Sequence, residues 1–275
     1  MIIDGRKFAS DKLRELKPEV AGLPFEPLFC DVIVGSDPVS MSYVKIKGKS
    51  AEQIGMGFKM FHFPESVSQQ YLVEEIKKIN FLPNICGLIV QLPLPKKFNG
   101  REILDAIDPN IDVDCIGSIR SGQFYRGDLG IIPPTAAAVV ALLDSLRLDL
   151  ATQNILVVGQ GALVGRPVSY LIKLRGLDIN IADIDTKNPE TLLKNADVII
   201  SATGQKQLIT GEKIKPGCVV IDAGTSESGG GIVGDADFGS VSKVAAYISP
   251  VPGGVGPVTV SMLLKNVFLV AKGKL

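Results

Sequence analysis

Lys47 is the residue whose type and position most directly suggest chemistry. The run 40–55 has the composition of a helix, and at ~100° per residue Lys47 shares one face with Tyr43, one turn earlier. That face also holds Ala51 and Ile54, whereas Lys45, Lys49 and Glu52 lie on the opposite side. A desolvated lysine loses its charge more readily than one in water, so Lys47 could accept a proton near neutral pH. The alternative is a lysine at the edge of the face whose ammonium group reaches solvent.

Polar groups that could serve the same site follow a predicted buried strand. The strand over 87–91 ends in Gln91, and open α/β sheets keep their sites at the carboxyl ends of strands. Further on, Asp112 and Asp114 alternate along an extended segment, so their carboxylates share one side. Either carboxylate could instead be a solvated turn residue, because the pattern alone is unspecific.

Residues 250–259 contain three prolines and three glycines. Proline fixes φ and lacks an N–H, and glycine opens backbone angles that other residues avoid, so this segment is expected to be neither helix nor inner strand. Its bare, rigid backbone would let a flat ligand lie close against it. The alternative is an ordinary turn before a terminal helix over 258–272.

A third group of residues has the pattern of a dinucleotide site. The strand predicted over 155–158 leads into Gly159, Gly161 and Gly165, with the spacing G-x-G-x-x-x-G, at the start of a helix. The free N–H groups and partial positive charge of a helix N-terminus suit a phosphate. Asp183 ends the next predicted strand, 24 residues after Gly159, about where a carboxylate can bind ribose hydroxyls. The alternative is a glycine-rich turn that binds no nucleotide.

These candidates lie on alternating strand and helix patterns, which predict an α/β protein with parallel sheets. The predicted strands are 28–34, 57–62, 87–91, 155–158, 178–182, 197–202, 218–222 and 245–248; the predicted helices are 6–17, 40–55, 67–80, 100–107, 135–147, 164–175, 189–195 and 258–272. The entry Asp37-Pro-Val-Ser40 predicts Ser40 as the capping residue of its helix. The break at Pro133-Pro134 predicts a second domain, and the terminal helix is expected to return to the first.

Composition excludes several classes of function. Lys+Arg and Asp+Glu both count 29, so no bulk charge favours nucleic acid or an anionic membrane. From the sequence, no apolar run reaches the ~18–20 residues needed to span a bilayer, and no signal pattern is present, so the expected location is the cytoplasm. Four cysteines without C-x-x-C spacing and the single His62 predict buried thiols and no metal site. His62 lies in an alternating run and is expected to pack or face solvent.

Together these runs resemble the bifunctional methylenetetrahydrofolate dehydrogenase/methenyltetrahydrofolate cyclohydrolases of the FolD type. The matching runs, in family order over nearly the whole chain, are Asp37–Lys47, Val90–Pro95, Asp112–Asp114, Val157–Pro167, Gly234–Phe238 and Pro250–Pro257. The resemblance implies a folate-binding catalytic domain over 1–132 plus 253–275, a Rossmann-like NAD(P)-binding domain over 133–252, a cleft between them and a homodimer. It also implies oxidation of 5,10-methylenetetrahydrofolate and hydrolysis of the product to 10-formyltetrahydrofolate.

The resemblance carries roles onto single residues. Lys47 becomes the catalytic residue, Gln91 its hydrogen-bond partner, Tyr43 a contact of the folate rings and Asp114 the pterin ligand. The implied substrate-binding set adds Leu92, Pro252, Gly253, Gly254 and Val255; the implied cofactor-binding set is Gly159, Gln160, Gly161, Gly165, Asp183, Ile184, Thr203, Gly204 and Thr225. A carboxylate beside Lys47 would hold the lysine in its charged form, whereas the uncharged Gln91 would not.

The sequence departs from the family at the groups that would hold a 2′-phosphate. The family usually has Arg-Ser at Gln160-Gly161 and often a histidine, serine and basic residue where this chain has Asp183-Ile-Asp185. Two carboxylates would repel a phosphate, so the sequence favours NAD over NADP, although Arg166 or Lys187 could reach one. Cys115 replaces the glycine after Asp-Val-Asp, and Pro134 and Ala136 also depart from the family.

The alternatives left open are an NAD-linked dehydrogenase with weak or lost cyclohydrolase activity, an NAD(P) oxidoreductase of another substrate, and a dinucleotide-binding module without catalysis.

Overall fold

The chain divides into two compact units. The computed structural model describes residues 1–228 and 231–274; unit 1 comprises Met1–Ala9 and Thr135–Thr259, and unit 2 comprises Ser10–Pro134 and Val260–Leu275. These bounds differ from the predicted domains at residues 1–9 and 253–259, which lie in unit 1, and at residues 133–134, which lie in unit 2. The N-terminal residues join unit 1 because Ile3 N–H donates to the carbonyl of Ile248 (2.9 Å) and Ile2 forms a parallel bridge with the same residue.

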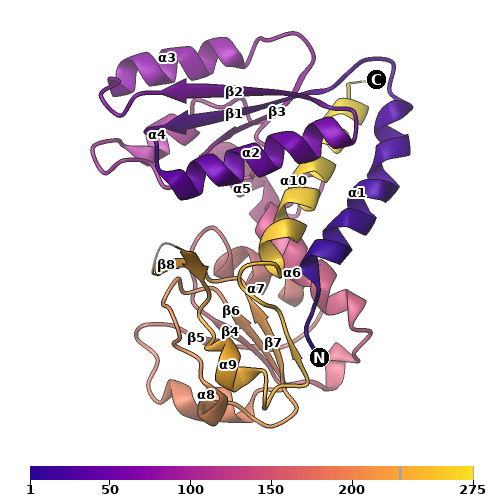
Figure 1. The fold of residues 1–275 in the computed structure, drawn as a ribbon, viewed down its shortest axis with the longest axis vertical. Helices are drawn as coiled ribbons and strands as arrows, with labels where there is room; N and C mark the ends of the chain where they lie inside the picture. The colour runs from indigo at the N-terminus through magenta and orange to yellow at the C-terminus, as the bar shows by residue number, and fades with distance from the viewer. Residues whose placement is uncertain (229–230, 275) are drawn as a thin grey trace. The chain divides into compact units, whose positions relative to one another are not determined.

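Unit 2 is built around a three-stranded parallel sheet in the order β2-β1-β3. The strands are β1 (Leu28–Val34), β2 (Gly57–Phe63) and β3 (Ile85–Val90), and the helices that lie wholly within the unit are α2 (Pro38–Gln53), α3 (Gln69–Ile79), α4 (Gly100–Leu104) and α5 (Ser118–Tyr125). Figure 1 shows α3 over one face of this sheet and α2 over the other. Alternate residues of β1 enter two separate cores, with Cys30 and Val32 against α3 and Phe29 in the core that contains Ala51 of α2.

Unit 1 contains a five-stranded parallel sheet in the order β10-β7-β6-β4-β5. Its strands are β4 (Ile155–Val158), β5 (Ile179–Ala182), β6 (Val198–Ser201), β7 (Val219–Asp222) and β10 (Tyr247–Ile248); β8 (Ser226–Ser228) and β9 (Gly231–Val233) pair separately, and the helices are α7 (Gly165–Leu174), α8 (Pro189–Asn195) and α9 (Phe238–Val241). The residues of β4, β6 and β7 are all buried, as continuous apolar runs in a covered parallel sheet should be.

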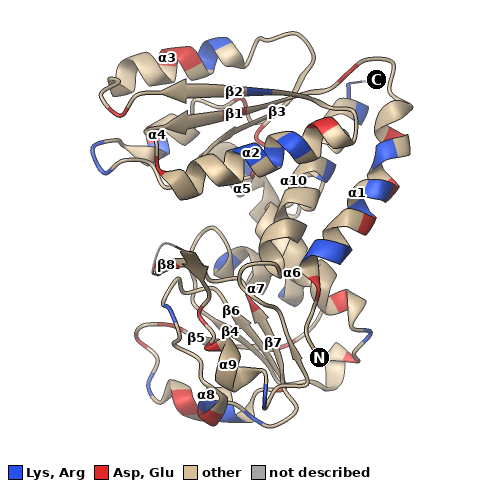
Figure 2. Cartoon of the chain, viewed as in Figure 1, with Lys and Arg blue, Asp and Glu red and all other residues tan. Residues whose placement is uncertain are grey.

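Three helices cross or touch the bounds of the units along the sequence: α1 (Gly5–Ala21), α6 (Pro134–Ser145) and α10 (Val255–Lys272). Helix α10 begins three residues before the predicted start, so the end of the Pro/Gly segment is helical. By its length and mean hydropathy (1.3) this helix is long and apolar enough to span a membrane, so the prediction that no apolar run reaches that length is wrong. In the structure 61% of the helix is buried, as in the core helix of a folded domain. Its buried residues pack in the same core as Phe29, and Figure 2 shows how few of its residues are charged.

Most predicted elements are present with ends shifted by a few residues. The prediction of Ser40 as the cap of α2 is wrong: Asp37 is the N-cap, and its Oδ2 accepts the N–H of Ser40 (2.7 Å). Ser40, three residues after the cap, is already inside the helix. His62 is exposed on β2, with Nε2 2.7 Å from the carbonyl oxygen of Gly35. The four cysteines are buried and free, as expected.

Candidate active site

Lys47 lies on the buried face of α2 and is only 7% exposed. Its Nζ donates a hydrogen bond to Oε1 of Gln91 (2.8 Å) and lies 2.6 Å from Oδ2 of Asp31. The helical spacing therefore placed the lysine correctly, and the alternative in which its ammonium reaches solvent does not hold. The expectation of an uncharged environment is wrong, because a carboxylate is in contact with the amine.

The topology of the sheet brings Lys47, Gln91 and Asp31 together. Helix α2 follows the central strand β1, and Gln91 follows the adjacent strand β3, with its N–H bonded to the carbonyl of Val32 (2.8 Å). The chain leaves β1 on one side toward β2 and returns on the other for β3, so the carboxyl ends of β1 and β3 form a switch point of the kind where α/β sheets bind ligands. The amide of Gln91 is itself fixed, because Nε2 donates to the carbonyl of Leu92 (2.6 Å).

Asp31 is the functional candidate that the sequence reasoning missed. It lies in the middle of β1, opposite Ile89 of β3 and Met60 of β2, and is fully buried. Burial raises the pKa of Asp31 to about 6, against the opposing charge of Lys47. The signal that could have found it is a lone carboxylate in the otherwise apolar run Leu28–Val34.

Asp114 reaches the same neighbourhood from a segment beside β3. Leu88 N–H donates to the carbonyl of Ile111 (2.9 Å), and Leu88 and Asp112 form a parallel bridge, so Asp114 follows at the carboxyl end of this pairing. Burial raises the pKa of Asp114, and the charge of Lys47 acts against this shift. Tyr43, also partly buried on α2, has its pKa raised by burial. The structure thus places Asp114 within the electrostatic reach of Lys47.

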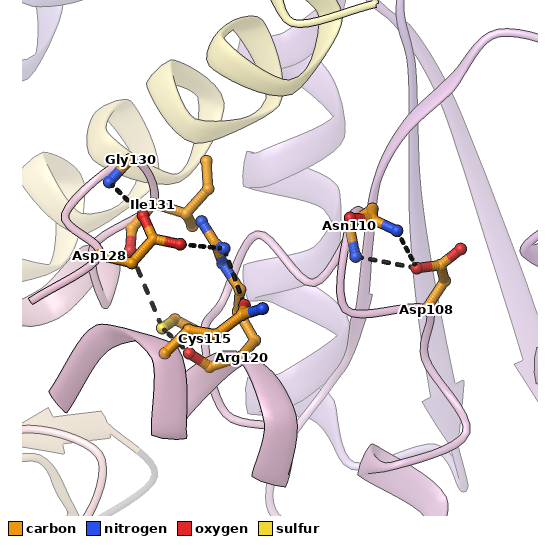
Figure 3. A network of polar contacts seen from close by, with 8 residues as sticks. Asp108, Asn110, Cys115, Arg120, Asp128, Gly130 and Ile131 are labelled. Atoms are coloured by element: carbon orange, nitrogen blue, oxygen red, sulfur yellow. Dashed lines mark hydrogen bonds and ion pairs between the residues drawn. The ribbon is translucent and has the colours of Figure 1, made fainter. Parts of the chain in front are cut away.

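Asp112 has a different task from Asp114. Its carboxylate accepts the N–H of Cys115 (2.9 Å) and of Gly117 (2.8 Å), which fixes the turn after Asp114. Cys115 adopts φ = 60°, a conformation that the glycine of the family would take without steric cost. Figure 3 shows Cys115 beside Arg120, whose guanidinium lies 3.0 Å from the carboxylate of Asp128. The departure at Cys115 therefore leaves the turn formed.

In unit 1 two of the three glycines after β4, Gly159 and Gly165, leave no room for a side chain. A Cβ on Gly159 would lie 2.6 Å from the carbonyl oxygen of Ala202, and one on Gly165 would lie 2.0 Å from that of Gly159. Gly161 has open space around it, so its missing side chain leaves room above the turn. The Gln160 side chain is already held by hydrogen bonds, because its Nε2 donates to Oγ of Ser169 (3.1 Å) and to the carbonyl of Gly159 (3.0 Å). This cradle fits a dinucleotide phosphate, which needs close approach to the backbone.

The adjacent turn after β6 completes the switch point of this second sheet. The strand order places β5 and β6 on either side of β4, so Gly159 and the run Thr203-Gly204 meet at the same edge. Thr203 N–H and Ser201 Oγ both donate to Oδ2 of Asp235 (2.7 and 2.6 Å). Sequence reasoning gave no role to Asp235, whose fully buried carboxylate anchors this turn.

The outer members of the predicted cofactor set are exposed. Asp183 directly follows the edge strand β5, and its Oδ1 accepts from Thr186 Oγ1 (2.9 Å) and from Asp185 N–H (3.1 Å). Ile184 is 92% exposed, and Thr225 is also exposed after β7. A second negative group, Asp185, stands at the same turn as Asp183.

The Pro/Gly segment also belongs to unit 1. Gly254 N–H donates to the carbonyl of Pro250 (2.7 Å), and the N-terminal segment passes so close that a Cβ on Gly5 would lie 1.9 Å from the carbonyl oxygen of Gly254. A hollow of about 440 Å³ is lined by Ile2, Asp4, Arg6, Pro250, Pro252 and Gly253. The predicted substrate set is therefore divided between the units: Tyr43, Lys47, Gln91, Leu92 and Asp114 in unit 2, and Pro252–Val255 in unit 1.

Comparison with known proteins identifies a catalytic domain and an NAD(P)-binding domain along the chain. The catalytic domain of the family tetrahydrofolate dehydrogenase/cyclohydrolase matches residues 3–114, and its NAD(P)-binding domain matches residues 133–275. The bifunctional protein FolD of Staphylococcus epidermidis is 38% identical, over 98% of this chain and 96% of its own. The bifunctional FolD enzyme of Campylobacter jejuni superposes with a TM-score of 0.94 at 35% identity, covering 100% and 99% of the two chains. The Trypanosoma brucei FolD structure, complexed with NADP cofactor and inhibitor, gives 0.93 at 34% identity, covering 100% and 98%.

A parallel sheet with a glycine cradle in one unit and a buried lysine at a sheet edge in the other define a two-unit α/β dehydrogenase that uses a nicotinamide dinucleotide. The chain belongs to the tetrahydrofolate dehydrogenase/cyclohydrolase family. It is an enzyme with dehydrogenase and cyclohydrolase activities on tetrahydrofolate derivatives.

Proposed function

We propose that the chain oxidises 5,10-methylenetetrahydrofolate with NAD⁺ and then hydrolyses the methenyl product to 10-formyltetrahydrofolate, with Lys47 as the residue that moves the proton. The bound dinucleotide supplies the hydride acceptor. In the second step water adds to the bridging carbon, its bond to one ring nitrogen breaks, and one proton leaves. The observation that carries the proposal is the buried Lys47 Nζ, held 2.8 Å from Gln91 at the carboxyl end of a parallel sheet.

The surrounding residues are assigned by their chemistry. Lys47 accepts the proton of the attacking water, and Gln91 orients the amine, since its own amide is fixed by Leu92. Asp114 pairs with the donor edge of the pterin through two oxygens. Tyr43, the backbone of Leu92 and the segment Pro252–Val255 contact the folate. Folate binding is assigned mainly to the domain predicted over 1–132 plus 253–275 and dinucleotide binding to the domain predicted over 133–252, with residues 1–9 and 253–259 folded into the compact unit of the second.

The test of this assignment is Lys47→Met, a side chain of similar length without the amine. We expect hydrolysis of methenyltetrahydrofolate to fall by ~10²–10⁴, as loss of a general base typically causes, while dinucleotide affinity is unchanged. Absorbance of the methenyl compound follows the reaction, and fluorescence titration follows the dinucleotide. Lys45→Met, on the exposed side of the same helix, is the matched control and should keep full activity. Hydrolysis within tenfold of wild type in Lys47→Met contradicts the assignment.

We assign NAD⁺ as the preferred dinucleotide. The sites expected to hold a 2′-phosphate carry Gln160, whose amide is bonded to Ser169, and the two carboxylates Asp183 and Asp185. A carboxylate accepts a hydrogen bond from a free 2′-hydroxyl and repels a phosphate. The related Trypanosoma brucei enzyme was crystallised with NADP, so this preference would distinguish the chain from that relative.

The assembly and location follow from the family rather than from the geometry. We assign a homodimer formed through the nucleotide-binding domains, which light scattering on the purified protein tests: a mass near 29 kDa would contradict it and twice that value would support it. The cytoplasm, where folate and dinucleotide are both present, is the assigned location.

A further inference from the structure

We propose that Asp31 is a positioning residue for Lys47 and also the buried negative charge that balances the cationic methenyl group of the folate. This inference rests on the proposed function, because it takes the folate to bind beside Lys47. It adds a carboxylate to the site that neither the sequence pattern nor the family resemblance assigned.

Asp31 occupies a buried position in an apolar strand, where a carboxylate is energetically unfavourable. Its neighbours along β1 are apolar, it is fully buried, and it shares with Phe29 the face of the sheet that α2 covers. Among the described residues no hydrogen-bond donor is aligned with either of its oxygens, although the Lys47 amine lies 2.6 Å from Oδ2. A buried carboxylate without aligned donors costs stability, so packing alone does not explain this residue.

The pair with Lys47 gives Asp31 a geometric effect. Nζ of Lys47 is held between two strands, with Asp31 on β1 at 2.6 Å and Gln91 after β3 at 2.8 Å. Two contacts from adjacent strands restrict the long, flexible lysine side chain to one place at the sheet edge. The charged groups acting on Asp31 are Lys47 from α2 and Asp114 from the segment beside β3. Helix α10 contributes apolar residues to the core on this face and the uncharged polar residues Ser261 and Asn266, both buried.

The pair also sets the net charge that the folate meets. With Asp31 ionised, the Asp31–Lys47 pair has zero charge when the amine is protonated and a single negative charge when it is neutral. Without Asp31 each of these values is one unit more positive. Methylenetetrahydrofolate has a neutral bridge and the methenyl compound a cationic one, so only the second gains from the negative charge. At several ångströms and an effective dielectric constant of ~20, one such charge is worth roughly tenfold or more in binding.

Asp31→Asn tests the inference because it removes the charge and keeps the shape. We expect the KM for the methenyl compound to rise about tenfold or more and the KM for the methylene compound to change less than threefold. Asp37→Asn is the matched control: it removes a carboxylate from the N-terminus of the same helix, and asparagine is an equally good cap. Equal changes for both folates, or no change for either, would overturn the role of Asp31.

Wild-type protein provides a second measurement that does not depend on folding of the variant. Since burial raises the pKa of Asp31 to about 6, the carboxylate becomes neutral as pH falls from 7 to 5. The ratio of the methenyl to the methylene KM should rise over this range, and a constant ratio contradicts the inference. Failure of the proposed function is recognised separately, because it would appear as hydrolysis retained in Lys47→Met.

Discussion

Asp183 and Gln160 are the residues on which cofactor choice depends. Gln160 is bonded to Ser169 across the glycine turn, and Asp183 holds Thr186 and Asp185 in a tight turn after β5. Neither offers a positive charge, and the exposed Lys187 and Arg166 are the nearest basic residues along the chain. The turn as folded thus presents an acidic surface where the adenosine ribose is proposed to bind.

We predict that kcat/KM with NAD⁺ exceeds that with NADP⁺ and that Asp183→Ser narrows the difference. Serine removes the like charge and supplies a hydroxyl that can donate to a 2′-phosphate. Steady-state rates with methylenetetrahydrofolate and each dinucleotide measure the effect, and Asp178→Ser, before the same strand, serves as the control. A tenfold or larger preference of the wild type for NADP⁺ would show that the pocket has been misread.

At this scale the sequence predicted the burial of Lys47 and the position of Gln91 beside it, but it gave no role to Asp31. Helical spacing placed Lys47 on the buried face, and the end of β3 placed Gln91, because both rules depend on local periodicity. Asp31 lies in a strand whose pattern is otherwise apolar, and it is a site candidate only because it contacts Lys47 of α2, sixteen residues later in the chain. The periodicity of a single strand or helix cannot predict such a contact. Asp235 was missed for the same reason, since its partners Ser201 and Thr203 lie at the end of β6 and just after it, more than thirty residues earlier in the chain.

The helices and strands themselves were predicted well where apolar runs are long. The strands 28–34 and 155–158 and the helix 189–195 have the predicted ends. The short helix α5, the antiparallel pair β8 and β9, and the four-residue α9 were not predicted. Each is short and only partly apolar. The N-cap of α5 is Gly117, which offers no side-chain cap, so tertiary packing rather than local sequence specifies this helix.

The end of α6 offers a test of backbone conformation. Arg147 follows this helix with φ = 54°, is exposed, and donates its N–H to the carbonyl of Asp144 (3.1 Å). A left-handed residue with a Cβ costs ~1–2 kcal/mol, which glycine avoids. We therefore predict that Arg147→Gly is more stable than Arg147→Ala by about 1 kcal/mol, measured by chemical unfolding. Equal stability of the two variants would mean that the helix end relaxes around the side chain.

At the scale of the whole molecule, buried carboxylates link stability to pH. Burial raises the pKa of Asp31, Asp112 and Asp222 to about 6 each, above the ordinary value of 3.8. The unfolded chain therefore releases these protons first as pH rises, so the stabilisation from the protonated forms is complete below pH ~4 and is lost through pH ~6.

We predict that the Asp31 contribution to the free energy of unfolding falls by up to about 3 kcal/mol between pH 4 and pH 7, from a shift of roughly two units at 1.36 kcal/mol each. Urea unfolding at several pH values should give a weaker pH dependence for Asp31→Asn than for wild type. Identical slopes in the two proteins would show that Asp31 titrates normally when folded.

The interleaving of the two units has a consequence for the order in which the protein is made. Residues 260–271 of α10 complete the core that holds Leu13, Leu16 and Phe29. A ribosome adds 5–20 residues per second, so the 10–134 segment waits on the order of ten seconds while 135–259 is synthesised. During that interval the side of this core that α10 covers stays exposed to solvent. We therefore expect the nascent chain to bind chaperones that shield exposed hydrophobic surface.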